Sequence, residues 1–206
     1  MPMVHNSAVE FYNDIFRNKP DKWASIERDY VAFRLISMYA QEPAIMLDVG
    51  CGNGHTLAFF WSQWPKTKYF GVDISPVALE IAMERLPMPM GEFHKHIPPY
   101  LRYDLITIMG VAEHFEDVPA ELRRIAEHLA QGGVIYLEAP NCLSYSHNKE
   151  EGFRQTYNGS GQNEWHWKRE TWEQNIQQAG LEIVKGYISP NPFWEFIWIL
   201  RKADER

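Results

Sequence analysis

The chain has 206 residues, a mass of 24.2 kDa and a formal net charge of −7 at pH 7. We expect a chain of this length to form a single domain, residues 1–206, with a sizeable core. The acidic balance and the lack of a run of Lys or Arg argue against nucleic acid as the main partner, because phosphate contacts need clustered cations.

Two cysteines do not make a disulfide framework. No apolar run in the sequence approaches the length of a membrane span, and Met1–Glu10 does not resemble a secretory signal. These features predict a cytoplasmic protein without a membrane partner.

Residues 1–42 are predicted to be helical and to precede the sheet. A first short helix is expected to end near Lys19–Pro20. A second helix has apolar residues at steps of three and four, which predicts one apolar stripe packed against the sheet: Ile26, Tyr30, Phe33, Ile36 and Ala40.

A short apolar run followed by three glycines predicts a strand, a tight turn and a helix. The strand begins at Ile45, the glycines are Gly50, Gly52 and Gly54, and the helix covers Asn53–Trp64. Glycines permit the tight turn and let a nucleotide-like ligand approach the backbone closely.

A second short strand, Tyr69–Val72, ends at Asp73, nineteen residues after Gly54. A carboxylate at this place can accept hydrogen bonds from a ribose diol. The dinucleotide fingerprint would need a third glycine at position 55, where the chain has His55, so a dinucleotide oxidoreductase is disfavoured.

The pattern Asp48-x-Gly50-x-Gly52-x-Gly54, together with Asp73, resembles the first motif of class I S-adenosylmethionine-dependent methyltransferases. The resemblance extends over residues 40–200 and is strongest to the small-molecule subgroup similar to ubiquinone-biosynthesis enzymes. It implies an α/β fold of three layers, Rossmann-like, with a mostly parallel seven-stranded sheet whose last strand is antiparallel.

The resemblance also implies S-adenosyl-L-methionine as the cofactor. Asp73 would bind the ribose hydroxyls, Ile74 would pack on the adenine, and Asp48 would orient the turn or a water molecule, or else only stabilise the turn. The set of cofactor-binding residues that it implies is Asp48, Gly50, Cys51, Gly52, Asp73, Ile74 and Met109. Cys51 is interpreted as a small buried residue rather than a nucleophile.

Related methyltransferases cover the cofactor or substrate with N-terminal helices, which gives residues 1–42 the role of a cap. Trp23, Arg28 and Tyr30 then become candidates to line the pocket. Arg28 can pair with the methionine carboxylate, although a solvated surface arginine is the favoured alternative.

The chain departs from the family after Glu92–Phe93, where many relatives have an acidic residue that contacts the adenine amino group. The residues that follow are His94, Lys95 and His96. Two histidines alone are too few for a metal site, so we expect none.

A fourth strand, Tyr103–Met109, precedes Glu113 and His114. Ligands of such sheets bind at the carboxyl ends of the strands, and histidine titrates near neutral pH. His114 is therefore the catalytic candidate, as a base or as a group that positions the substrate, and a turn-capping role is the alternative. Asp117 is predicted to cap a helix over Pro119–Leu129.

A fifth strand, Val134–Glu138, leads to residues 142–168, which have no clear period and are expected to form a substrate-facing loop. Its polar candidates are Tyr145, His147, Tyr157 and His166, and His166 is equally interpreted as a buried structural histidine.

A helix over Arg169–Ala179 and two strands, Leu181–Ile188 and Phe193–Leu200, complete the predicted elements. Trp194, Phe196 and Trp198 share one face of the last strand, which predicts a core or homodimer contact.

These features predict methyl transfer from S-adenosylmethionine to a small-molecule acceptor, with an O, N, S or C atom as the target. The alternatives are an inactive cofactor-binding accessory protein and a methyltransferase that acts on a protein. The expected partners are a small-molecule substrate and, through the last strand, a second copy of the chain.

Overall fold

The computed structural model describes residues 6–86, 89–142, 152–155, 163–189 and 195–203. These residues form two compact units, Met1–Thr107 and Ile108–Arg206. Tyr145, His147, Tyr157 and Trp194 lie outside the described residues.

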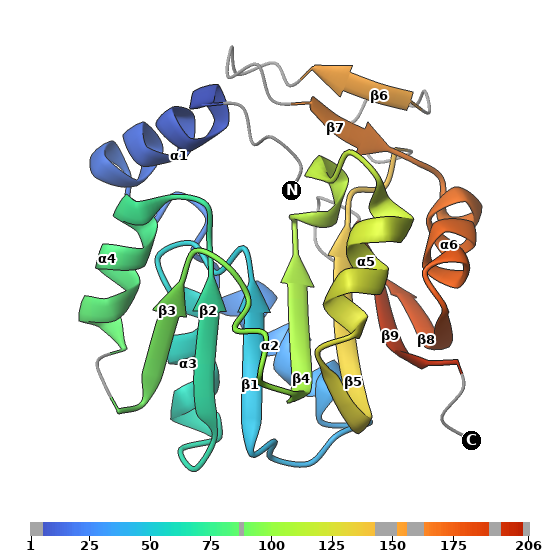
Figure 1. Cartoon of the computed structure of the whole chain (residues 1–206), viewed down its shortest axis with the longest axis horizontal. Coiled ribbons are helices and arrows are strands. Elements are labelled where there is room, and N and C mark those ends of the chain that lie inside the picture. Colours follow the sequence, from blue (N-terminus) through green and yellow to red (C-terminus); the bar gives the residue numbers. More distant parts are fainter. Residues whose placement is uncertain (1–5, 87–88, 143–151, 156–162, 190–194, 204–206) are drawn as a thin grey trace. The chain divides into compact units, whose positions relative to one another are not determined.

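The first unit alternates helices and parallel strands (Figure 1). Ile45 of one strand lies opposite Lys68 of the next, and Tyr69 lies opposite Gly91. Its elements in chain order are α1 (Asn6–Asn18), α2 (Ile26–Ile36), β1 (Ile45–Val49), α3 (His55–Gln63), β2 (Lys68–Val72), α4 (Pro76–Arg85), β3 (Gly91–His94) and the greater part of β4 (Tyr103–Met109).

Helix α4 begins with a serine cap and a proline. The hydroxyl of Ser75 accepts a hydrogen bond of 3.1 Å from the backbone N–H of Ala78, and Pro76 is the first helical residue. Ala78, Leu79 and Ala82 are buried and form the inner face of this helix.

Helix α2 buries a different face from the one expected. Its buried residues are Asp29, Ala32 and Ile36, whereas Ile26 and Tyr30 are 67% and 53% exposed. The prediction of an apolar stripe that begins at Ile26 is therefore wrong. Positions 29, 32 and 36 also have helical spacing, so the pattern fits this face equally well. The hydrogen bonds of the Asp29 carboxylate offset the cost of burying it.

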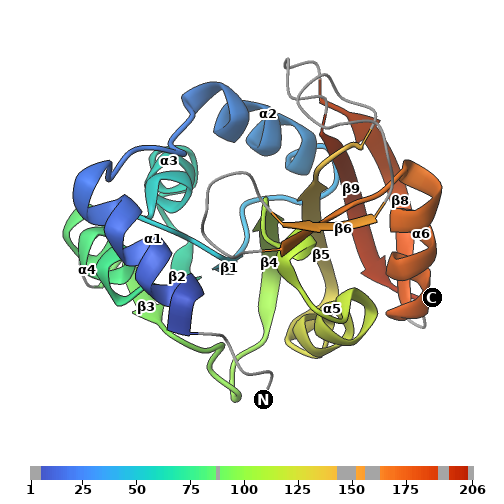
Figure 2. The same ribbon diagram turned by 90° about the horizontal axis from the view of Figure 1, so that it is seen from above.

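The side of α2 that carries Phe33 packs on α3, and the two helices lie side by side in Figure 2. The ring of Phe33 lies 5.9 Å from that of Phe60 and 4.9 Å from that of Trp64, measured between centroids. Aromatic pairs at these distances add to the stability that burial supplies.

The second unit begins with the end of β4 and contains the antiparallel strands. Its further elements are the 3₁₀ helix η1 (Ala112–His114), α5 (Val118–Ala126), β5 (Leu129–Ala139), β6 (Gly152–Gln155), β7 (Asn163–His166), α6 (Arg169–Gln178), β8 (Leu181–Ile188) and β9 (Phe196–Lys202).

Helix α5 and strand β5 meet earlier in the chain than predicted. Asp117 caps α5 as expected, with Oδ1 3.0 Å from the backbone N–H of Ala120. The helix ends at Ala126, and Leu129 already belongs to β5, where its carbonyl accepts a hydrogen bond from the Lys202 ammonium of β9. The spacing of Leu129 suits a helix face as well as a strand, and spacing alone therefore could not place it in the strand.

Strand β9 runs antiparallel to both of its neighbours, with Leu137 opposite Trp198 and Ile188 opposite Phe196. Phe196 and Trp198 are buried, which confirms their predicted place in the core. Helix α6 packs on β8, with Trp172 buried and its ring 6.3 Å from that of Trp198 (Figure 2).

The strand order of the seven-stranded sheet is β3-β2-β1-β4-β5-β9-β8. This order, with an antiparallel strand inserted near one edge, confirms the predicted Rossmann-like methyltransferase fold. Strands β6 and β7 form a separate two-stranded sheet within the segment that was expected to be a loop. Among the described residues, no helix is long and apolar enough to span a membrane.

Candidate cofactor site and catalytic turn

The glycine turn after β1 is tied to the end of β2. The backbone N–H groups of Gly50 and Cys51 both donate to the carbonyl of Val72, at 2.7 and 3.0 Å. The N–H of Gly52 donates to Oδ2 of Asp73 at 2.9 Å. The two turns that the sequence predicts as ligand-binding are thus joined directly.

Asp73 holds both turns through separate oxygens. Its Oδ1 accepts a hydrogen bond of 2.8 Å from the N–H of Ser75, while Oδ2 binds Gly52. Burial raises the pKa of Asp73, and the hydrogen bonds from Ser75 and Gly52 lower it in part. A carboxylate has about four lone-pair positions, so these two contacts leave acceptor capacity for a ribose diol.

Gly52 and Gly54 both have a left-handed φ, and a Cβ on either residue would lie close to a helix. Gly54 has a left-handed φ of +73°, and a Cβ at this position would lie 3.0 Å from the Cβ of Ala82 in α4. A Cβ on Gly52 would lie 3.1 Å from the ring of Phe16 in α1. Helix α1 therefore lies against the glycine turn.

A second contact holds α1 in place. The hydroxyl of Ser75 lies 2.7 Å from Oδ1 of Asn13, so α1 also contacts the turn after β2. Figures 1 and 2 show α1 beside α4, the helix that this turn precedes. Asn13 and Phe16 were missed by the sequence analysis, because neither residue belongs to a motif.

Asp48 is buried at the end of β1, with 4% of its surface exposed. Its Oδ1 accepts a hydrogen bond of 2.6 Å from the hydroxyl of Thr107 in β4. Burial raises the pKa of Asp48 to about 7; the bond from Thr107 lowers it, and the charge of Asp29 raises it further. The contact with Thr107 joins the ends of β1 and β4, and the predicted role of Asp48 at the turn stays a prediction.

Cys51 is a small buried residue, as interpreted from the sequence. The residue is 6% exposed, and its Sγ lies 3.7 Å from the carbonyl oxygen of Gly52. Burial raises the pKa of the Cys51 thiol, which is the opposite of what a nucleophilic cysteine needs.

The remaining candidates of the first unit are only partly exposed or lie at the surface. Ile74 is half-buried between Asp73 and Ser75, and Arg28 is half-buried on α2, while Trp23 and Tyr30 are 44% and 53% exposed. His94 stacks on Phe70, with centroids 6.4 Å apart, and lies 3.6 Å from a carboxylate oxygen of Glu92.

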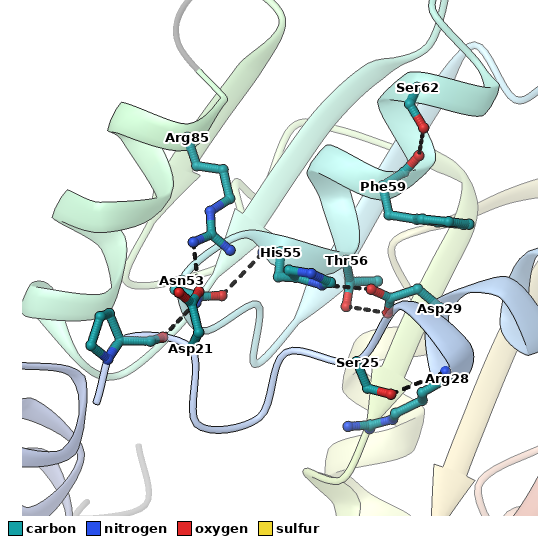
Figure 3. A network of polar contacts seen from close by, with 11 residues as sticks. Asp21, Ser25, Arg28, Asp29, Asn53, His55, Thr56, Phe59, Ser62 and Arg85 are labelled. Carbon is teal, nitrogen blue, oxygen red and sulfur yellow. Dashed lines mark hydrogen bonds and ion pairs between the residues drawn. The ribbon is translucent and has the colours of Figure 1, made fainter.

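A buried polar network near the glycine turn was not predicted (Figure 3). Asp29 accepts hydrogen bonds from His55 and Thr56, and Asn53 donates to Asp21. The only signal in the sequence was that Asp29 has a helical spacing to Ala32 and Ile36. A single acidic residue in a helix is usually exposed to solvent, so this signal is weak.

The second unit contains Met109 and His114. Both are half-buried, and His114 is the last residue of η1, with its backbone N–H 3.0 Å from the carbonyl of Val111. The carbonyl of the next residue, Phe115, accepts a hydrogen bond of 2.9 Å from the indole N–H of Trp165 in β7. Strand β7 thus holds the turn that carries His114.

His166 is buried in β7, and its Nε2 lies 2.6 Å from Oε1 of Glu164. This contact favours the interpretation of His166 as a structural histidine. Among the described residues, no group of His, Cys, Asp or Glu is arranged to bind a metal ion.

Comparisons with known proteins agree with this geometry. A family model described as a methyltransferase domain matches residues 24–185. The trans-aconitate 2-methyltransferase of Afipia carboxidovorans is 31% identical over 98 residues, which are 47% of this chain and 38% of that protein. The malonyl-[acyl-carrier protein] O-methyltransferase of Acetivibrio thermocellus is 25% identical, over 49% of this chain and 37% of that protein.

Among solved structures, the 1,6-didemethyltoxoflavin-N1-methyltransferase of Burkholderia thailandensis has a TM-score of 0.77. The alignment covers 96% of this chain and 88% of that protein, with 17% sequence identity. At this identity the similarity shows a shared fold and nothing more. The chain spans less than half the length of the curated relatives named above. Because the family model matches most of the chain, the family predicted from the glycine turn is confirmed: the chain belongs to the methyltransferase-domain family.

Proposed function

We propose that this protein transfers a methyl group from S-adenosyl-L-methionine to a small-molecule acceptor. The observation that carries this proposal is the hydrogen bond between Gly52 and Asp73, which joins the turns after β1 and β2. A cofactor with a ribose and an amino-acid end needs a carboxylate close to the N-terminus of a helix, and this bond brings Asp73 next to the turn that leads into α3.

Specific residues of the first unit fit this cofactor. Asp73 has unused acceptor capacity for the ribose hydroxyls, and the N-terminus of α3 offers N–H groups to a carboxylate. Ile74 is half-buried next to Asp73 and would contact the adenine. Asp48 would support the turn rather than contact the cofactor directly, because its carboxylate is hydrogen-bonded to Thr107.

The bound cofactor supplies a methyl group on a sulfonium, which leaves readily. The work of the chain is then to align the acceptor with that methyl group and to exclude water. His114, the last residue of η1, is the proposed catalytic residue, and Met109, the last residue of β4, is a proposed cofactor contact. Residues 142–168 are proposed to contribute to acceptor binding, because Trp165 from this segment holds the turn of His114.

A carboxylic acid is the proposed class of acceptor. The two curated relatives named above are a trans-aconitate and a malonyl-thioester methyltransferase, and both of those substrates carry carboxyl groups. A carboxylic acid is ionised at neutral pH without help, because its pKa is about 4. His114 would then position the acceptor rather than remove a proton from it, whereas a hydroxyl acceptor would need His114 as a base.

Titration calorimetry with S-adenosylmethionine and S-adenosylhomocysteine tests the cofactor assignment, with NAD as the control. We expect saturable binding of both sulfur compounds and none of NAD. Methyl transfer from labelled cofactor to a panel of di- and tricarboxylic acids, compared with their fully esterified forms, then tests the acceptor. Binding without transfer to any acceptor would favour the accessory protein, and labelling of a protein instead would favour a protein methyltransferase.

The proposal covers one domain with residues 1–42 as its N-terminal cap. A homodimer, if formed, would not use Phe196 or Trp198, since both are buried in the chain itself. Sedimentation of the purified protein over a range of concentrations measures this state directly.

A further inference from the structure

The segment that connects α1 and α2 is bound to the glycine turn by Asn53. The side-chain amide of Asn53 donates to the carbonyl of Pro20 and, at 2.9 Å, to Oδ1 of Asp21. The Arg85 guanidinium of α4 donates to the same Asp21 oxygen at 2.7 Å and lowers the pKa of Asp21. Residues near position 20 are therefore attached to both the turn and α4 (Figure 3).

Asp29 makes a second, more buried attachment. It belongs to α2 and is 2% exposed. Its Oδ2 lies 2.7 Å from Nδ1 of His55, and its Oδ1 accepts a hydrogen bond of 2.8 Å from the hydroxyl of Thr56. Each carboxylate oxygen thus has one partner, and both partners come from the same turn of α3.

His55 and Thr56 are the first two residues of α3 and follow Gly54 directly. The backbone N–H of His55 is held in addition by Oδ1 of Asn53, at 3.1 Å. Figure 3 shows the His55 ring and the Thr56 hydroxyl pointing from α3 toward Asp29. The first turn of α3 follows the glycine turn directly in the chain. A contact that holds the first turn of α3 therefore also restricts the conformation of the glycine turn.

A buried carboxylate is costly unless it is paired or hydrogen-bonded, so Asp29 is an unusual residue for the inner face of a helix. Leucine or alanine would pack there without this cost. A carboxylate has two acceptor oxygens and can therefore contact His55 and Thr56 at the same time, which an apolar side chain cannot do. The geometry therefore indicates a task beyond packing.

We propose that Asp29 is a positioning residue of the cofactor site, which holds the glycine turn and the first turn of α3 in the binding conformation by means of His55 and Thr56. This inference rests on the proposed function, because the glycine turn is the proposed cofactor site. It also makes the N-terminal helices part of the site: if α2 leaves its place, the carboxylate that orders the turn leaves with it.

The test variant is Asp29→Asn, which keeps the size of the side chain but presents one oxygen and one NH₂ group. Both contacts then lose the charge of the carboxylate, and one of them must reverse its direction, because the NH₂ group can only donate. The matched control is Glu27→Gln, which removes the same charge from the first turn of the same helix at an exposed position. A further variant, Thr56→Val, removes one of the donors while keeping the shape of the side chain.

Hydrogen exchange of the free protein tests the positioning role without any ligand. In Asp29→Asn we expect the amides of residues 50–58 to exchange roughly tenfold faster than in the wild type. Glu27→Gln should exchange at the wild-type rate. Unchanged exchange in Asp29→Asn, or equally fast exchange in the control, would overturn the inference.

Calorimetry with S-adenosylhomocysteine tests the consequence for the site. Loss of a hydrogen bond to a charged group should raise the dissociation constant of Asp29→Asn roughly tenfold. Thr56→Val should raise it too, and the double variant should be no weaker than Asp29→Asn alone. The rate at saturating cofactor should stay near the wild-type value, since the effect is on binding.

A lowered melting temperature with an unchanged dissociation constant would mean that Asp29 serves only the fold, and the inference would be wrong. If the wild type itself does not bind S-adenosylhomocysteine, the proposed function fails. The exchange experiment still decides then whether Asp29 orders the glycine turn.

Discussion

The backbone N–H of Gly52 donates a hydrogen bond of 2.9 Å to Oδ2 of Asp73, which joins two turns that lie 21 residues apart in the chain. Both residues belong to the pattern by which the family was predicted, one as a glycine and the other as a ribose-binding acid. The structure adds that Asp73 shapes the glycine turn, because its carboxylate holds the Gly52 N–H.

Asp73→Ala should therefore weaken cofactor binding for two reasons: the ribose loses its acceptor, and the Gly52 N–H loses its partner. We expect the dissociation constant for S-adenosylhomocysteine to rise by a factor of roughly 100, as for the loss of one or two hydrogen bonds to a charged group. Calorimetry measures it, with Glu84→Gln on the exposed face of α4 as the control. Wild-type affinity in Asp73→Ala would show that the ribose assignment is wrong.

The raised pKa of Asp48, about 7, predicts a pH dependence of stability. Between pH values of about 4 and 7 the folded protein holds a proton that the unfolded chain has lost, so the free energy of unfolding falls as the pH rises. This contribution is present in full below the unfolded pKa of 3.8 and is lost as the pH rises through about 7.

Asp48→Asn should remove this dependence, because the amide stays neutral and its oxygen still accepts the Thr107 hydroxyl. Urea unfolding at about pH 5 and about pH 8 should show the wild type losing stability relative to the variant, by about 1 kcal/mol or more. Asp14→Asn, on the exposed side of α1, is the control. Parallel pH curves for the wild type and Asp48→Asn would contradict the assignment.

His114→Ala should lower turnover while leaving cofactor binding nearly intact. A positioned acid–base or orienting group contributes a factor of about 100 or more to the rate. Initial rates at saturating cofactor and calorimetry together measure this, with the exposed His96→Ala as the control. Equal rates in His114→Ala and the wild type would restrict His114 to the turn-capping role.

Trp165→Phe tests whether β7 supports the turn of His114. The variant keeps an aromatic ring but leaves the Phe115 carbonyl without the indole N–H at 2.9 Å. We expect a loss of about 1 kcal/mol in stability, as for one hydrogen bond, together with reduced turnover. Trp61→Phe, at a residue of α3 that is 36% exposed, is the matched control. Stability that falls while turnover stays at the wild-type value would limit Trp165 to a structural role.

The fold, the family and the turns of the proposed cofactor site were predictable from the amino-acid sequence. These follow from local patterns: apolar runs followed by glycines, an acid at the end of the next strand, and helix caps such as Ser75 and Asp117. Such signals are short in sequence, because a turn or a cap is made by residues that are neighbours in the chain.

Only the tertiary structure decided which face of α2 is buried, that Leu129 begins a strand, and that Asp29 holds the first turn of α3. Each of these depends on a partner far away in the sequence, and helical spacing alone suits more than one face. An Asp in a helix is expected in solvent until its hydrogen-bond partners are known, since the cost of burying it depends on whether they are present.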